Sequence, residues 1–189
     1  VVEQLRTREG HHLFCYPFAG RLVHEGLASL LAWRLARRLP ATFSLSANDH
    51  GLELVSATEF TVDEAALRTL LSTEALLPDV LACINGAELA RRRFREIARI
   101  AGLVFQGFPG AGKSARQLQT STGLVYDVLR EHDPDNALVA QALTEVLGAQ
   151  LELDRLRRTL EGLGAQPIVL TRPPRLTPFA FPLWVDRIE

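Results

Sequence analysis

Residues 107–114, GFPGAGKS, match the pattern G-x-x-x-x-G-K-[ST] of a phosphate-binding loop at every fixed position. In such a loop the backbone N–H groups surround the phosphates, the lysine contacts the outer phosphates, and the hydroxyl helps to hold Mg2+. Gly107, Gly112, Lys113 and Ser114 would then be the nucleotide-binding residues of an autonomous NTPase. This interpretation constrains the fold, because such a loop joins a buried parallel strand to a helix in a sheet of several such units.

The sequence around this motif favours another structure. The apolar residues of 87–105 fall on one arc of a helix, which predicts a helix directly before the motif: Ala90, Phe94, Ile97, Ala98, Ala101 and Val104. The best candidate for an acidic residue that would position Mg2+ is Asp186, near the end of the chain and after Pro182. We therefore predict a glycine-proline turn between two helices, and the NTPase stays as the alternative.

The composition predicts an ordered globular protein without a strong overall field. The chain has 189 residues, 47% of them apolar, which is enough for one domain with a core, with a possible subdivision into 1–60, 61–165 and 166–189. A formal net charge of -1 means that contact with nucleic acid would depend on a local patch. No apolar run approaches membrane-spanning length, so we expect no membrane partner.

Cysteine usage and the chain ends give two further expectations. Cys15 and Cys83 lie far apart without metal-ligand spacing, which favours a reducing, cytoplasmic location over a disulfide framework. The sequence begins without methionine and stops directly after an apolar run. We therefore expect it to be a piece of a larger polypeptide.

The secondary-structure signals predict an α+β fold, with long amphipathic helices in the middle and strands at both ends. Residues 11–18 resemble a strand, and FSLSANDHGLELV predicts a β-hairpin with Phe43, Leu45, Leu52 and Leu54 on its buried face. One or two proline-punctuated strands are expected in 167–185. Helices are predicted at 24–39, from Thr61 or Asp63 to about 71, from 73, at 87–105, at 115–132 with a break near 121–123, and at 137–163.

The last of these helices carries a heptad repeat. Val139, Val146, Leu153 and Leu160 recur seven residues apart. This face is either part of the protein's own core or a protein-interaction module, and the sequence leaves both open.

The most basic surface that the sequence predicts is the opposite arc of helix 87–105, with Arg91, Arg92, Arg95 and Arg99. Such a face is either solvated and paired with Glu88 and Glu96, or in contact with phosphate. The residues give no catalytic constellation. His11, His12 and Cys15 lack the spacing and the fourth ligand of a metal site, so we expect neither catalytic nor metal-binding residues.

Several long segments resemble one known family. They are HHLFCYPFAGRLVHEGLASLLAWRL, FSLSANDHGLEL, FREIARIAGLVFQGFPGAGKSARQLQTSTGLVYDVLREHDPDN and LTRPPRLTPFAFPL. In this order they are similar to the C-terminal DEAD/H-associated region of ligase-associated, large helicase-related DEXH-box helicases. The resemblance covers nearly the whole chain.

This resemblance implies a function for the parent protein. Two RecA-like motor domains and a winged helix would lie upstream, bind ATP and Mg2+, and power translocation on single-stranded DNA, in a setting such as DNA repair. The present region would be an accessory domain without a cofactor of its own. Gly112 stands where the family commonly has arginine or another polar residue, and the tryptophan that stacks on a base belongs upstream, so Trp33 and Trp184 do not inherit that role.

With this resemblance, phosphate contact becomes the expected role of the basic side chains. The helix N-terminus after the turn and the loop around Pro173-Pro174 add candidates to the four arginines of helix 87–105. These additional candidates are Lys113, Arg116, Gln117, Arg172 and Arg175.

Overall fold

The structure is a computed structural model that describes residues 1–83, 86–103, 107–108, 111–112 and 115–188; within these ranges it leaves out the side chains of 86–89, 91, 92, 95, 107–108, 111–112, 115–121, 149–151 and 188. The chain forms two compact units. The first, the sheet unit, comprises Val1–Ile84 and Leu151–Glu189. The second, the helical unit, comprises Asn85–Gln150.

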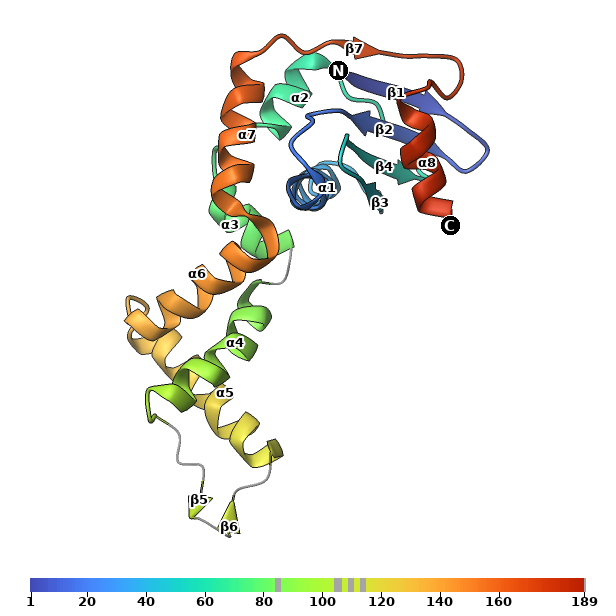
Figure 1. Ribbon diagram of the computed structural model, residues 1–189. Helices are drawn as coiled ribbons and strands as arrows, with labels where there is room; N and C mark the ends of the chain where they lie inside the picture. The colour runs from blue at the N-terminus through green and yellow to red at the C-terminus, as the bar shows by residue number, and fades with distance from the viewer. Residues whose placement is uncertain (84–85, 104–106, 109–110, 113–114, 189) are drawn as a thin grey trace. The chain divides into compact units, whose positions relative to one another are not determined.

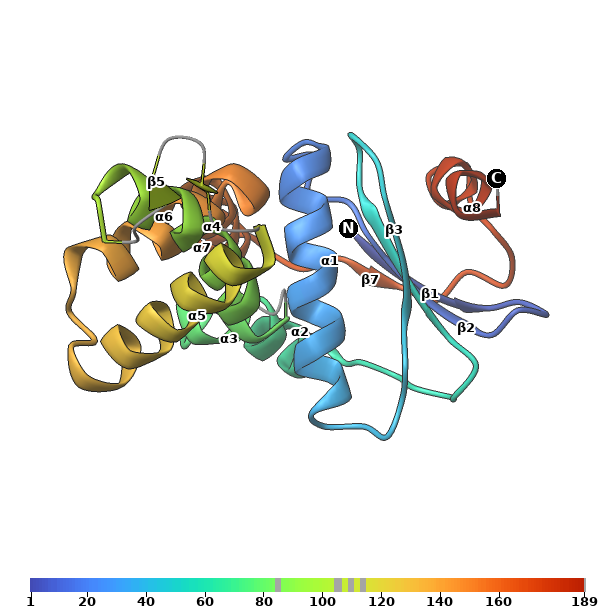
Figure 2. The ribbon, with the colours of Figure 1, turned by 90° about the horizontal axis from the view of Figure 1, so that it is seen from below.

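The sheet unit is built on a five-stranded sheet whose strand order is β3-β4-β2-β1-β7. All neighbouring strands pair antiparallel except β1 and β7, which are parallel. Helix α1 (Arg21–Ala36) covers one face of the sheet and α8 (Ala180–Ile188) covers the other, as Figure 2 shows. The strands are β1 (Val2–Arg6), β2 (His11–Cys15), β3 (Ser44–Ala47), β4 (Leu52–Ser56) and β7 (Leu170–Thr171).

The predicted hairpin is present as β3 and β4, with Ala47 opposite Leu52. The Asn48 side-chain oxygen accepts the backbone N–H groups of His50 and Gly51 at 3.0 and 3.2 Å, which stabilises the turn. Leu52 and Leu54 are fully buried. The prediction for Leu45 was wrong, because β3 is an edge strand and the side chain of Leu45 is exposed.

Three further helices belong to the sheet unit: α2 (Glu64–Leu70), α3 (Leu76–Cys83) and α7 (Leu153–Ala165). Asp63 caps α2 as predicted, because its carboxylate accepts the N–H of Ala66 at 2.8 Å. Helix α1 has the predicted length, but its first and last residues each lie three positions earlier than in the predicted range of 24–39. Strand β1 was not predicted, and β2 ends at Cys15 instead of 18.

The C-terminal prediction of one or two strands was only partly right. Leu170–Thr171 form the short strand β7, but Ala180–Ile188 form helix α8. The hydroxyl oxygen of Thr177 accepts the N–H of Ala180 at 3.2 Å, three residues on, and Pro178 follows this cap directly. Threonine as a cap followed by proline in the first turn is a typical helix start, so the apolar run continues as a helix.

The helical unit contains α4 (Gly86–Ile100), α5 (Ala115–His132) and most of α6 (Ala137–Leu151), which are labelled in Figure 1. One cluster of buried core side chains comes from all three helices: Ala90, Phe94, Ile97, Ala98, Tyr126, Val139 and Ala142. The rings of Phe94 and Tyr126 lie 5.3 Å apart between centroids. Helix α5 is continuous, so the predicted break near 121–123 was wrong.

Two helix ends differ from the predictions. Helix α4 ends at Ile100 and not at 105, because Gly102 takes a φ of 70° and the N–H of Leu103 bonds back to the Ala98 carbonyl at 2.9 Å. The predicted helix at 137–163 is two helices, α6 and α7, separated by Glu152 with a φ of 41°. The heptad face is therefore not continuous, and three of its four residues, Val139, Val146 and Leu160, are buried.

Candidate nucleic-acid interface

Helix α4 presents an apolar side to the core of the helical unit and a charged side to solvent. Phe94 and Ile97 are buried, whereas Arg99 in the last turn is exposed. The side chains of Arg91, Arg92 and Arg95, and of their predicted partner Glu88, lie outside the described residues. Of the predicted arc, the structure therefore places only Arg99, and it leaves the guanidinium group in water.

Arg93, between these arginines in sequence, has a different environment. Its Nε donates to Oε2 of Glu145 in α6 at 2.6 Å, which ties α4 to α6 across the surface of the helical unit. A hydrogen bond from Gln141 and one from Arg93 lower the pKa of the Glu145 carboxyl. Arg93 is thus engaged within the protein, which separates it from the arc of candidate phosphate contacts.

The described part of GFPGAGKS forms a small antiparallel ladder. β5 (Gly107–Phe108) pairs with β6 (Ala111–Gly112), with Gly107 opposite Gly112. A phosphate-binding loop instead follows a strand of a parallel sheet, and neither strand of this ladder joins the five-stranded sheet. Lys113 and Ser114 lie outside the described residues, as does Val104. α5 begins at Ala115, but the side chains of Arg116 and Gln117 are not among those described.

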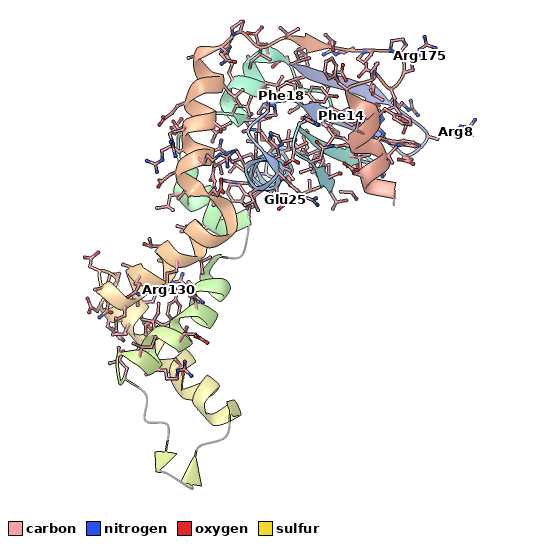
Figure 3. The ribbon with its side chains drawn as sticks, in the orientation of Figure 1. Arg8, Phe14, Phe18, Glu25, Arg130 and Arg175 are labelled. Atoms are coloured by element: carbon pink, nitrogen blue, oxygen red, sulfur yellow. The ribbon has the colours of Figure 1, made fainter. Side chains whose placement is uncertain are left out.

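Arg172 and Arg175 follow strand β7 in the sheet unit, and both are exposed as predicted for a surface loop. Figure 3 shows Arg175 pointing away from the sheet, and Arg8 projecting outward from the β1–β2 turn. Neither Arg8 nor Arg6 was predicted as a contact residue from the sequence. A signal was present, since both arginines lie shortly before Gly10, which directly precedes the predicted strand at 11–18.

Beneath α8 lies a buried chain of polar contacts. Nδ1 of His12 contacts Oε1 of Glu53 at 2.7 Å, and Arg187 Nε donates to Oε2 of Glu53 at 2.9 Å. Arg187 also contacts Glu9, whose pKa is lowered chiefly by that hydrogen bond, and Trp184 donates to the same carboxylate at 3.2 Å. His12 is thus committed to a carboxylate.

His12 and Cys15 do not converge on a metal site. His12 faces α8, and Cys15 is buried, where desolvation raises the pKa of its thiol to about 12. Among the residues that the structure describes, there is no group of three or more His, Cys, Asp or Glu side chains arranged to hold a metal ion. None of the described helices has the length and apolar character needed to cross a membrane.

The comparisons with known proteins agree on one family. Residues 1–180 match the model of the DEAD/H associated family. The chain is 25% identical over 185 residues to "ATP-dependent helicase Lhr-Core protein 2" of Thermococcus barophilus and 27% identical over 193 residues to "ATP-dependent helicase Lhr-Core" of Methanothermobacter thermautotrophicus. These matches cover 97% and 95% of this chain but 21% of each relative, so the chain spans about a fifth of their length.

A solved structure has the same fold. The helicase Lhr of Mycobacterium smegmatis, bound to ssDNA and AMP-PNP, matches 98% of this chain and 23% of its own, with a TM-score of 0.59 and 22% identity. The similarity thus extends over both units of the present chain, and the α+β architecture is shared. With the family model matched along almost its whole length, the chain belongs to the DEAD/H-associated family and is homologous to Lhr helicases.

Proposed function

We propose that this chain is an accessory domain of an ATP-dependent DNA helicase and that it binds single-stranded DNA. The observation that carries this proposal is the similarity of 98% of the chain to part of a helicase structure that is bound to ssDNA. The described surface supports it, because Arg99, Arg172 and Arg175 are exposed. An Arg guanidinium binds phosphate oxygens in a bidentate manner, which suits contact with the DNA backbone.

The chain would act without a cofactor. The parent's ATP and Mg2+ would bind in RecA-like motor domains, which together with a winged helix would be its intramolecular partners. The antiparallel pairing of Gly107 with Gly112 argues against a nucleotide site in the present chain, because neither strand that the structure describes within the motif belongs to a parallel sheet. The phosphate-contacting candidates are Arg91, Arg92, Arg95, Arg99, Lys113, Arg116, Gln117, Arg172 and Arg175.

The proposal predicts binding that weakens with salt. A fluorescently labelled oligonucleotide of about 20 thymidines, followed by anisotropy, is expected to bind the 189-residue chain with a linear decrease of log K against log salt concentration. A variant with Arg91, Arg92, Arg95 and Arg99 changed to alanine is expected to bind more weakly. The slope of log K against log salt concentration should become about 3 smaller in magnitude, because each phosphate contact with a single strand contributes about 0.7 to it.

A matched control distinguishes the effect of losing the α4 arginines from the effect of a changed net charge. Exposed arginines on other helices can be replaced in equal number, in a variant with Arg21, Arg68, Arg157 and Arg158 changed to alanine. This control is expected to lose less affinity and less slope. Equal losses would exclude the α4 arc as the site, and a chain that binds no oligonucleotide would overturn the proposed function. MgATP affinity that Lys113→Ala abolishes would establish the NTPase alternative instead.

A further inference from the structure

Two segments far apart in the sequence meet at one end of the five-stranded sheet. β7 pairs in parallel with β1, with Val2 opposite Leu170 and Glu3 opposite Thr171, so both strands leave the sheet in the same direction. Figures 1 and 2 both show the β1–β2 turn and the segment after β7 at this end. The two segments carry four exposed arginines, which we call the basic edge: Arg6, Arg8, Arg172 and Arg175.

The basic edge differs from most of the other arginines of the sheet unit, because it lacks acidic partners among the described residues. Over the described part of the chain, none of its four guanidinium groups has an ion pair or side-chain hydrogen bond. On the helices of the same unit, arginine–glutamate pairs are common: Arg21–Glu25 at 3.0 Å, Arg68–Glu64 at 2.8 Å and Arg155–Glu152 at 2.8 Å. Clustered charges of one sign create a local potential that attracts a polyanion, even though the net charge of the chain is -1.

The carboxylates closest in sequence do not neutralise this edge. Glu9, in the β1–β2 turn, is held by Arg187 and by the Trp184 indole. Glu3 of β1 is buried and accepts hydrogen bonds from the hydroxyls of Tyr16 at 2.8 Å and Thr177 at 2.7 Å. Both acids are thus bound to groups under α8, and the four arginines are left to solvent.

Two exposed aromatic rings lie at the start of α8, one toward the basic edge and one at the other end of β1. The contact of Trp184 with Glu9 places α8 against the β1–β2 turn, and the Phe181 ring lies 6.0 Å from Trp184. The Phe179 ring lies against Tyr16, with 5.6 Å between the ring centroids, and the N–H of Tyr16 donates to the Val1 carbonyl at the other end of β1 from Arg6 and Arg8. Phe179 is 62% exposed and Phe181 54%, although both are large apolar side chains that normally gain free energy from burial.

We propose that the basic edge together with Phe179 and Phe181 forms a binding surface for single-stranded nucleic acid in the sheet unit, in addition to the α4 arc. The arginines contact phosphates, and the two phenylalanines stack on unpaired bases. Single-strand binding sites combine these two features, since a base offers its face for stacking only when it is not in a duplex. This inference rests on the proposed function and assigns it a second surface, with Arg6, Arg8, Phe179 and Phe181 as new participants.

The test uses the 189-residue chain and two variants that remove the two features separately. In the first, Arg6, Arg8, Arg172 and Arg175 are changed to alanine, and the salt slope for a single-stranded oligonucleotide is expected to fall by about 3. In the second, Phe179→Ala and Phe181→Ala are combined, and affinity is expected to fall about tenfold or more, with an unchanged salt slope. Leu124→Ala with Val128→Ala, which removes two exposed apolar side chains of the helical unit, is the control and should bind like the parent chain.

Altered oligonucleotides distinguish stacking from charge. With an abasic oligonucleotide or a duplex of the same length, the phenylalanine variant is expected to bind like the parent chain, whereas the arginine variant still binds more weakly. Circular dichroism and the urea midpoint check that both variants are folded. If the unchanged chain does not bind the oligonucleotide, the proposed function is overturned. If the unchanged chain and both variants bind it with equal affinity, only this inference is overturned. An effect of the arginines without one of the phenylalanines would exclude base stacking.

Discussion

Arg187 in the sheet unit and Arg93 in the helical unit each donate a hydrogen bond to a glutamate, but in different surroundings. Arg187 Nε lies 2.9 Å from Glu53, whose side chain is 0% exposed, and the Arg187 side chain is 17% exposed. Arg93 Nε lies 2.6 Å from Glu145, and these side chains are 52% and 33% exposed. The shorter hydrogen bond is therefore the one that water can replace.

The buried pair belongs to a chain of contacts that leaves neither carboxylate oxygen of Glu53 free. His12 contacts Oε1 and Arg187 contacts Oε2. A charge in such a site must have partners because water cannot reach it, so its contacts hold the fold together. The exposed pair adds little, since solvent and salt screen it. The basic edge, with no acidic partner among the described residues, is the third case, in which the charge is available to a ligand.

The largest expected effect comes from breaking the buried pair. Arg187→Ala leaves the Glu53 carboxylate buried with one oxygen unpaired, and should lower the free energy of unfolding by about 3 kcal/mol. Urea unfolding followed by circular dichroism measures this change. Arg175→Ala, which removes an exposed arginine of the basic edge, is the matched control and should change the free energy by less than about 0.5 kcal/mol. Equal stability of the two variants would contradict the difference drawn between paired and free arginines.

A smaller effect is expected from a buried group that has to be neutral. Nε2 of His24 accepts the N–H of Ala19 at 2.9 Å, and its Nδ1 lies 2.6 Å from the Asn48 carbonyl, to which it donates. Only the neutral ring can make both bonds. Burial, the largest cause, lowers the pKa of His24 below the ordinary value of 6.5.

The pH dependence of unfolding follows from this direction. As pH falls through 6.5, the unfolded chain takes up the proton more readily than the folded chain, so the stability that neutral His24 provides at higher pH is lost. The urea midpoint should decrease between pH 7.5 and 5, and His24→Gln should make that decrease smaller. A slope that His24→Gln does not change would assign the pH dependence to other groups.

Local signals in the sequence predicted those elements whose ends are fixed by neighbouring residues. The β3–β4 hairpin and the α2 cap follow from Asn48 and Asp63, whose side chains bond backbone groups two or three residues away. The α8 cap at Thr177 was equally local, but the prolines of the surrounding run favoured strands. The break at Glu152 has no such signal, because the heptad pattern continues across it and a glutamate seldom adopts a positive φ.

The candidate site could be predicted only in part for the same reason. The exposure of Arg99 follows from the helical period of α4. The gathering of Arg8 with Arg175 does not, because it depends on the pairing of β1 with β7 at opposite ends of the chain. Sequence patterns specify which residues share a face of one element, whereas a surface built from two distant segments requires their register.

The smallest expected effect concerns the exposed pair and appears in a titration. The pKa of Glu145 is lowered by hydrogen bonds from Gln141, the larger cause, and from Arg93. Gln141→Ala and Arg93→Ala should each raise this pKa toward the ordinary value of 4.5, with the larger change for Gln141→Ala. Carboxyl carbon chemical shifts measured by NMR across the acid range report the pKa directly.

Although Arg93→Ala should raise the pKa of Glu145, it should change the free energy of unfolding very little, because the Arg93–Glu145 pair is exposed. The contribution of Glu145 to folding is present above 4.5 and lost as pH falls through its lowered pKa, so at pH 7 in about 0.5 M NaCl the urea midpoint of Arg93→Ala should match that of the parent chain. Arg187→Ala under the same conditions should still unfold at lower urea, because salt does not screen a buried carboxylate. If salt instead restored the urea midpoint of Arg187→Ala to that of the parent chain, the Glu53 carboxylate would be accessible to solvent. The Arg187–Glu53 and Arg93–Glu145 pairs would then differ in their number of contacts and not in burial.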